Sequence, residues 1–237
     1  MKTFRKSSLI SSVALLLVAI VALSGATFAW FSTNNSATAG TLEMTATSAS
    51  GLYIAETDYT VAVAPESGWS SKIVWDDNMP SMKAVSGDAS APTAFFTTST
   101  DNADGTWNET DAIYAANANA DFIVKKIWVK ADSTDPQTLT ITPAVTGDMK
   151  GYERIAIVVD GDVTIMDNAG DTYDAFTSQA GATKSITASA FAPIKVENVD
   201  LSTAKEVLVY MWFEGQDAEC YNLNSGADFT LDLKFAI

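Results

Sequence analysis

The segment from Arg154 to Met166 constrains the fold most strongly, because it has the signature of a complete β-hairpin. Two runs of apolar and β-branched residues flank the dipeptide Asp160-Gly161. This dipeptide supplies the two positive-φ residues of a type I′ turn, whose twist matches the twist of the flanking strands. The segment therefore predicts two adjacent antiparallel strands.

Further strands are predicted closer to the C-terminus. The run 207–213 (VLVYMWF) is apolar at every position, which is typical of a central strand covered on both faces. In the last segment, every second residue is apolar, which predicts a half-buried strand; these residues are Phe229, Leu231, Leu233 and Phe235. A short helix is predicted for residues 111–120 (DAIYAANANA).

Roughly eight to eleven short strands joined by turn-rich loops predict an all-β fold, a jelly-roll-like antiparallel β-sandwich. Residues 30–237 are expected to form one domain, because they contain no Pro-rich linker and no repeat of fixed period. Residues 67–120 are the least regular part and are expected to elaborate one edge. The interior of the sandwich is expected to contain Val209, Met211 and Phe213, facing the apolar residues of the last strand.

Residues 1–29 have the order of regions found in a signal peptide. Basic residues occupy the start, and an almost wholly apolar run extends from Leu9 to Leu23. Signal peptidase requires small side chains at positions −1 and −3, and Ala29 and Thr27 meet this requirement, so the mature chain is expected to begin at Trp30. The alternative is an uncleaved membrane anchor, because the apolar stretch approaches the roughly 20 residues that span a bilayer.

The charge and composition of the chain exclude several classes of function. The chain has 14 Lys plus Arg against 29 Asp plus Glu, a formal net charge of −15, and such a chain repels nucleic acids and anionic lipids. We therefore expect no nucleic-acid partner, and membrane contact only through the uncleaved precursor. The chain has no His and a single Cys, Cys220, which excludes catalytic triads built on His, His-ligated zinc and internal disulfides.

Catalytic motifs of the common nucleophile and nucleotide-binding types are also missing from the sequence, which predicts that the protein is not an enzyme. A hydrolase that uses a pair of carboxylates remains an alternative, because a sequence with 29 acidic residues does not exclude such a pair in a cleft.

Two Asp-rich loops are candidates for calcium binding, because carboxylate and carbonyl oxygens are the ligands of calcium. The first contains Asp101 and Asp104, and the second contains Asp167 and Asp171. The spacing in the first loop departs from that of an EF-hand, and Asp, Asn and Gly are also the commonest turn residues. No cofactor is therefore predicted, with calcium at these loops as the alternative.

Three tryptophans, Trp69, Trp75 and Trp107, fall in loop-rich sequence. Exposed aromatic rings stack on sugars, so a monomeric surface adhesin or carbohydrate-binding module is an alternative function. The simpler interpretation is that these rings cap the ends of the sandwich.

The segment 26–42 (ATFAWFSTNNSATAGTL) couples a Thr-aromatic-Ala cleavage site to a second aromatic residue, a polar stretch and an Ala-Gly-Thr-Leu motif. It resembles the start of the TasA/camelysin family of secreted Gram-positive surface and biofilm-matrix proteins. The positions that carry the resemblance are Thr27, Phe28, Ala29, Phe31 and Ala39-Gly40-Thr41-Leu42.

The resemblance implies a secreted jelly-roll domain that self-assembles into extracellular fibres on the cell surface or in the matrix, where other matrix or surface proteins are further candidate partners. It also implies that the freed N-terminal segment is added as a strand to the next subunit; the donor residues would be Trp30, Phe31, Ser32, Thr33, Asn34 and Asn35. Such a contact is head-to-tail and does not close, so it makes filaments. Some relatives are described as metalloproteases, but a chain without His has no ligand cluster for that activity.

Overall fold

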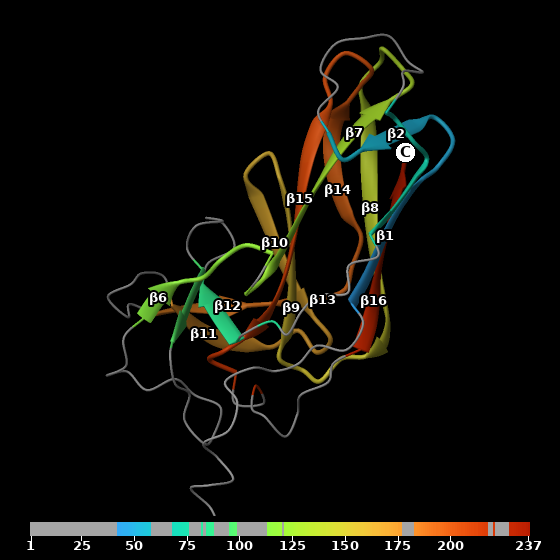
Figure 1. The fold of residues 1–237 in the computed structure, drawn as a ribbon. Helices are drawn as coiled ribbons and strands as arrows, with labels where there is room; N and C mark the ends of the chain where they lie inside the picture. The colour runs from blue at the N-terminus through green and yellow to red at the C-terminus, as the bar shows by residue number, and fades with distance from the viewer. Residues whose placement is uncertain are drawn as a thin grey trace, which may run out of the picture. The chain divides into compact units, whose positions relative to one another are not determined.

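The computed structural model describes residues 42–57, 68–75, 82, 84–87, 95–98, 113–119, 121–176, 183–217, 220 and 228–237. By its internal contacts the chain divides into two units, Met1–Asn34 and Asn35–Ile237. The first unit lies outside the described residues, so the following description concerns the second. Every helix or strand element among the described residues is a β-strand, which confirms the predicted all-β class (Figure 1).

Five strands form the first sheet, sheet A, in the order β14-β8-β16-β1-β3. Their bounds are Leu42–Ser48 for β1, Lys72–Trp75 for β3, Gln137–Asp148 for β8, Ile194–Val199 for β14 and Asp228–Ala236 for β16. β16 pairs antiparallel with β8 and parallel with β1. Its alternating pattern is the one predicted, because Phe229, Leu231, Leu233 and Phe235 are all buried.

The second sheet, sheet B, is built around β15. Its main strands are β2 (Leu52–Ala55), β7 (Ile123–Ala131), β9 (Glu153–Val159), β10 (Asp162–Asp167), β13 (Ser189–Ala190) and β15 (Lys205–Glu214). β15 pairs antiparallel with β9 on one edge and with β7 on the other, and β4 takes the place of β7 beside the last residues of β15. The remaining strands are β4 (Ala84–Gly87), β5 (Phe95–Thr98), β6 (Ile113–Ala115) and the hairpin of β11 (Thr172–Phe176) and β12 (Thr183–Thr187).

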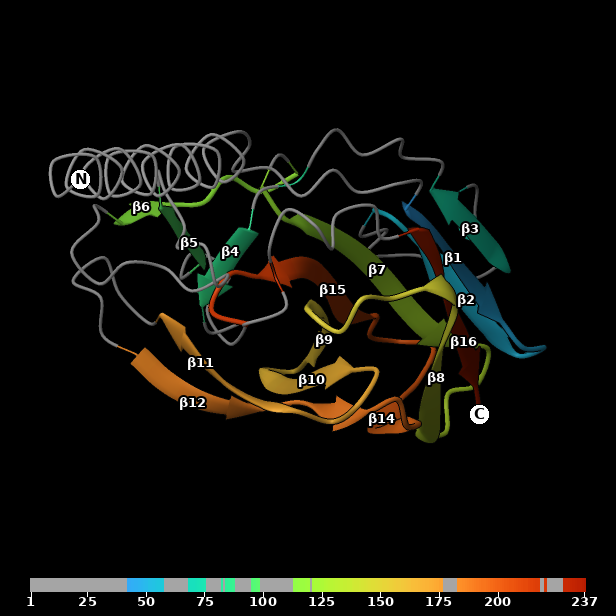
Figure 2. The same ribbon diagram turned by 90° about the horizontal axis from the view of Figure 1, so that it is seen from below.

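The two sheets pack face to face as a sandwich, and the main hydrophobic core lies between them (Figure 2). As predicted, β15 contributes Val209, Met211 and Phe213 to this core, and β16 contributes residues such as Leu231 and Leu233. The chain passes from one sheet to the other at successive strands, from β7 to β8 to β9 and from β14 to β15 to β16. This alternation gives the jelly-roll-like sandwich that the sequence predicts.

The outer face of β15 is covered as well, as its continuous apolar run predicts. Tyr210 and Trp212 are buried on that face against Phe95 and Phe122. The ring of Phe95 lies 4.5 Å from that of Phe122 and 5.1 Å from that of Trp212, between centroids. Stacked and edge-to-face aromatic pairs of this kind stabilise a core beyond the area that they bury.

The hairpin predicted from Asp160-Gly161 is confirmed. β9 and β10 pair antiparallel on either side of the turn, and both turn residues have positive φ, 52° for Asp160 and 88° for Gly161. The helix predicted for residues 111–120 is wrong, because Ile113–Ala115 is strand β6, paired with β5. Ile and Tyr favour strands, and the free edge of β5 supplies hydrogen-bond partners that an isolated short helix lacks.

The segment 67–120 contributes more regular structure than its sequence suggests, since β3 joins sheet A and β4, β5 and β6 extend sheet B. Three pairs of neighbouring strands are parallel, β1 with β16, β4 with β15 and β10 with β13, in a sandwich expected to be antiparallel. Parallel neighbours need long connections, which local sequence patterns do not reveal.

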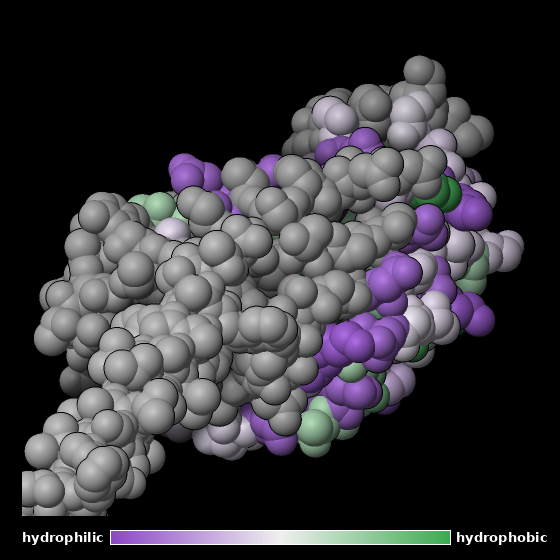
Figure 3. All heavy atoms as spheres, turned by 60° about the horizontal axis from the view of Figure 1, so that its bottom comes forward, coloured by the Kyte–Doolittle hydropathy of each residue, from purple (hydrophilic) through white to green (hydrophobic). Residues whose placement is uncertain are grey.

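The described surface is largely hydrophilic. Among the described residues, the large hydrophobic side chains that are exposed are Val74 and Ile237. Figure 3 shows hydrophilic residues predominating on the described part of the face that it presents.

Among the described residues, no helix has the length and apolar character needed to cross a membrane.

Candidate functional site

Among the strands that the structure describes, the two sheets are joined along one side and left unjoined along the other. On the joined side, β2 of sheet B meets the start of β3 of sheet A, where Ile54 and Ser70 exchange two backbone hydrogen bonds of 2.9 Å. On the other side, β14 is the outer strand of sheet A, and the described partner of β10 beyond β9 is β13, at Met166 and Asp167. Within the described residues, therefore, positions 162–165 of β10 and the outer edge of β14 have no strand partner.

A groove lies between these two edges and contains an open cavity of about 280 Å³. Its floor is apolar: Ile157 and Val159 come from β9, Val196 comes from β14, and all three side chains are buried. Small-molecule sites usually enclose roughly 300–1,000 Å³, so this cavity is at the lower limit for a small ligand and suits a single large side chain.

The rim of the groove is polar and carries charges of both signs, from Asp160, Asp162, Lys195, Glu197 and Lys205. Lys205 Nζ lies 2.6 Å from Asp160 Oδ2, and Thr138 donates a hydrogen bond of 2.7 Å to Glu197. The described residues that line the groove include no His, Ser or Cys. The groove therefore offers two strand edges that have no partner strand among the described residues, together with an apolar floor, which are features of a docking site.

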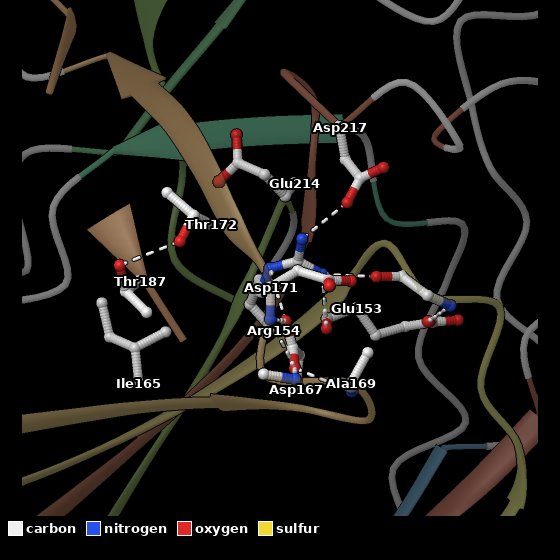
Figure 4. A network of polar contacts seen from close by, with 12 residues as sticks. Glu153, Arg154, Ile165, Asp167, Ala169, Asp171, Thr172, Thr187, Glu214 and Asp217 are labelled. Carbon is white, nitrogen blue, oxygen red and sulfur yellow. Dashed lines mark hydrogen bonds and ion pairs between the residues drawn. The ribbon is translucent and has the colours of Figure 1, made fainter. Parts of the chain in front are cut away.

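A second cluster of polar residues lies on the outer face of sheet B, around the fully buried Arg154 (Figure 4). Its Nη2 donates to Asp217 Oδ2 at 2.5 Å, and its Nη1 donates to the carbonyl oxygens of Gly151, at 2.5 Å, and Glu153, at 3.1 Å. Its Nε lies 3.7 Å from Asp167 Oδ2. The guanidinium thus joins β9 to the end of β10 and to the turn that follows β15.

Asp167, one of the calcium candidates, faces this arginine and also stabilises the loop that follows it. Its carboxylate accepts hydrogen bonds from the backbone N–H groups of Ala169, Gly170 and Asp171. The side chain of Asp171 is exposed. Among the described residues, no three Asp, Glu, His or Cys side chains are grouped so as to hold a metal ion.

Glu214 is fully buried at the junction of β15, β4 and β11. It accepts hydrogen bonds from Trp212 Nε1 at 3.0 Å and from the N–H of Gln216 at 3.1 Å, and it is also hydrogen-bonded to Ser86. The hydroxyl oxygen of Ser86 in turn accepts the N–H of Phe176 at 3.0 Å. Burial raises the pKa of Glu214 to about 7, although its hydrogen-bond donors oppose this shift.

This network was not predicted from the sequence, because its members come from distant segments. Among the described residues, four buried or nearly buried acids lie around the cation Arg154; they are Glu153, Asp167, Glu214 and Asp217. A substrate has no access to a guanidinium and a carboxyl that are both completely buried. We therefore interpret the network as structural, holding the outer strands and the turn after β15 against sheet B.

The raised pKa of Glu214 predicts that the stability of the domain depends on pH. The folded state binds this proton more tightly than the unfolded chain, whose pKa is close to 4.5, so the free energy of unfolding falls as pH rises from about 4.5 to above about 7. The difference between the two pKa values corresponds to about 3 kcal/mol. Glu214→Gln should remove this part of the pH dependence.

Urea unfolding at pH 5 and pH 8 measures this effect, with Glu197→Gln, which removes an exposed acid, as the control. Burial raises the pKa of Glu153 too, so the variant should keep a smaller slope of the same sign. A Glu214→Gln protein with the full wild-type pH dependence would show that another group is responsible.

The other candidate residues are distributed as follows. The cleavage residues Thr27 and Ala29, the donor segment Trp30–Asn35, the calcium candidates Asp101 and Asp104, and Trp107 all lie outside the described residues.

The two described tryptophans of the predicted loop group are partly buried. Trp75 packs against the main core, and the ring of Trp69 lies 4.4 Å from Lys130 Nζ. These positions fit rings that cap the sandwich better than rings presented to a sugar.

Comparison of the chain with protein-family models, with curated proteins and with solved structures gives no match.

Proposed function

We propose that this protein is a secreted structural subunit of an extracellular surface or biofilm-matrix fibre of a Gram-positive-type bacterium. Each mature subunit donates its N-terminal strand to the sandwich of the next. The observation that supports this proposal is the open side of the sandwich, where the edges of β10 and β14 have no strand partner among the described residues. Such edges bind an added strand, and a contact between the start of one subunit and the edge of another extends without closing.

The composition of the N-terminal segment supports the same proposal. Residues 7–42 contain no Lys, Arg, Asp or Glu, in a chain that otherwise carries an excess of acid. Burying an uncharged strand between two sheets avoids the large cost of desolvating a charge. The protein acts by assembly and has no catalytic activity in this proposal.

The mature protein is expected to begin at Trp30, because Thr27 and Ala29 fill the −3 and −1 positions of a cleavage site. N-terminal sequencing of the secreted protein measures this directly. Ala29→Arg should block processing, since Arg is too large for the −1 pocket of the peptidase. A protein that starts at Met1, or that stays in the membrane fraction, would contradict the proposal.

Deleting residues 30–35 from the mature protein is expected to abolish polymer formation and to leave the melting temperature nearly unchanged. The described strands begin at Leu42, so the deletion removes none of them. Electron microscopy and sedimentation measure the polymer, and calorimetry measures the melting temperature. If the segment is instead a strand of its own sandwich, the deletion should lower stability by several kcal/mol.

A mixing experiment provides the control for the deletion. The shortened protein keeps its acceptor edge, so a small fraction added to the full mature protein should dock at growing ends and shorten the fibres. Fibres of unchanged length would show that the deletion damages the acceptor, or that growth does not depend on strand donation.

A further inference from the structure

The outer face of sheet A presents a regular array of short hydroxyl side chains. In β1, β8 and β16, residues such as Met44, Ile141 and Leu231 fill the main core, so the residues that alternate with them point outward. Most of the uncharged residues on this outer face are threonines; they are Thr45, Thr47, Thr140, Thr142, Thr146 and Thr230. Side chains this short leave room for a second sheet to pack closely over the face.

One end of this face carries acidic residues. Asp228 is the first residue of β16, and it lies opposite Asp148 of β8. Glu43 of β1 lies opposite Thr230, two residues further along β16. All three acidic residues are exposed, and Asp148 forms an ion pair with Lys150. The acid band, defined as Glu43, Asp148 and Asp228, therefore stays negative after this pair is counted.

Lysines gather further along the same strands. Lys234 follows Asp228 by six residues of β16, roughly 20 Å. Lys234 and Lys72 pair with Thr47 of β1 from its two sides, and Lys195 of β14 lies two residues beyond this level. All three lysines are exposed, and the ion pairs formed among the described residues involve none of them. This lysine band is a positive patch on a chain whose net charge is −15.

The two bands make the face complementary to itself. A second copy can place the same face over this one with its strands running either parallel or antiparallel. Parallel strands bring like charges together, whereas antiparallel strands bring the lysine band of each copy over the acid band of the other. A two-fold axis generates this antiparallel arrangement. Two further acids of the face accept hydrogen bonds from threonines, Asp232 from Thr45 and Glu197 from Thr138.

We propose that the outer face of sheet A is an interface between two copies of this chain, packed face to face with antiparallel strands and oriented by the charged bands. The contact goes beyond the proposed function, because it joins subunits side by side and does not use the open edges. The five strands present roughly 600 Å² per copy, which is below the roughly 800 Å² per partner of a typical specific interface. An isolated pair is therefore weak, but many such contacts acting together along two fibres bundle them.

Two double variants of the mature protein test the charged bands. Lys72→Glu with Lys234→Glu reverses the net charge of the lysine band, and Glu43→Lys with Asp228→Lys reverses that of the acid band. The readout is the protein concentration at half-maximal side-by-side pairing. Electron microscopy measures this as the paired fraction of fibre length where fibres form, and sedimentation measures it as dimer formation where they do not. Circular dichroism checks that each variant is folded.

Each double variant alone should raise this concentration by at least about 10-fold, because like charges then meet in both halves of the contact. An equimolar mixture of the two variants should pair nearly as well as the wild type, since each copy supplies the charge that the other lacks. Recovery on mixing also shows that neither variant lost pairing by misfolding.

The matched control is Lys126→Glu with Lys184→Glu, which makes the same change of charge at exposed lysines outside sheet A. It should pair like the wild type. The inference is overturned if the wild-type protein forms neither paired fibres nor dimers, if the control loses as much pairing as the lysine-band variant, or if mixing restores nothing. Fibres that form but stay single contradict this interface alone, whereas dimers without fibres contradict strand donation alone.

Discussion

Replacing Phe213 by alanine is expected to lower the free energy of unfolding by about 3–5 kcal/mol. Phe213 is 1% exposed and lies in the main core, and its ring makes an edge-to-face contact with Tyr152 at 5.3 Å between centroids. The truncation removes apolar contacts and leaves a cavity that strands from two sheets are poorly able to close. Urea unfolding measures the change.

Phe191→Ala is the matched control, because it removes the same atoms from a ring that is only partly buried against the same core. Phe191→Ala should lower the free energy of unfolding by clearly less than Phe213→Ala does. A loss below about 1 kcal/mol for Phe213→Ala would contradict the assignment of this side chain to the interior.

Arg154→Met is expected to destabilise the domain by a similar amount, about 3–5 kcal/mol, because removing one partner of a buried ion pair leaves the other charge uncompensated. The variant leaves Asp217 and Asp167 without their cation, and it also removes the donors to the carbonyl oxygens of Gly151 and Glu153. Methionine occupies much of the space of the aliphatic part of the arginine side chain. The loss of stability therefore reflects the missing charge and hydrogen bonds more than the missing volume.

Lys205→Met provides the comparison for this experiment. Lys205 forms an ion pair with Asp160 at 2.6 Å, but the Asp160 side chain is 53% exposed, and pairs of this kind contribute about 0–1 kcal/mol. If both variants lose the same small amount, the network around Arg154 does not stabilise the fold. A large loss for Arg154→Met together with a small loss for Lys205→Met supports its structural role.

The parts of the fold that were predicted from the sequence depend on local patterns. The Asp160-Gly161 turn, the continuous apolar run of β15 and the alternation in β16 each follow from residues that are neighbours in the chain. The period of the hydrophobic pattern and the residue types found in the turns determine such elements directly. The prediction that Val209, Met211 and Phe213 face the interior is also confirmed, but the run 207–213 is apolar at every position, so its own pattern does not distinguish the two faces of β15.

The parts that were not predicted depend on contacts between distant segments. The parallel pairing of β1 with β16 joins residues that are nearly 190 positions apart, such as Thr45 and Asp232, whose side chains are also hydrogen-bonded. The Arg154 network and the open groove are likewise assembled from several strands that are separated in the chain. The helix prediction for 111–120 failed for a related reason, because pairing with β5 outweighed the weak local signal.

The central claim is that each subunit donates its N-terminal strand to the open side of the next. A reconstruction by electron cryomicroscopy of the polymer formed by the mature protein tests it most directly. We expect a strand from the neighbouring subunit between the edges of β10 and β14. A mature protein that stays monomeric, or a polymer in which this groove is empty or filled by the subunit's own segment, would contradict the claim.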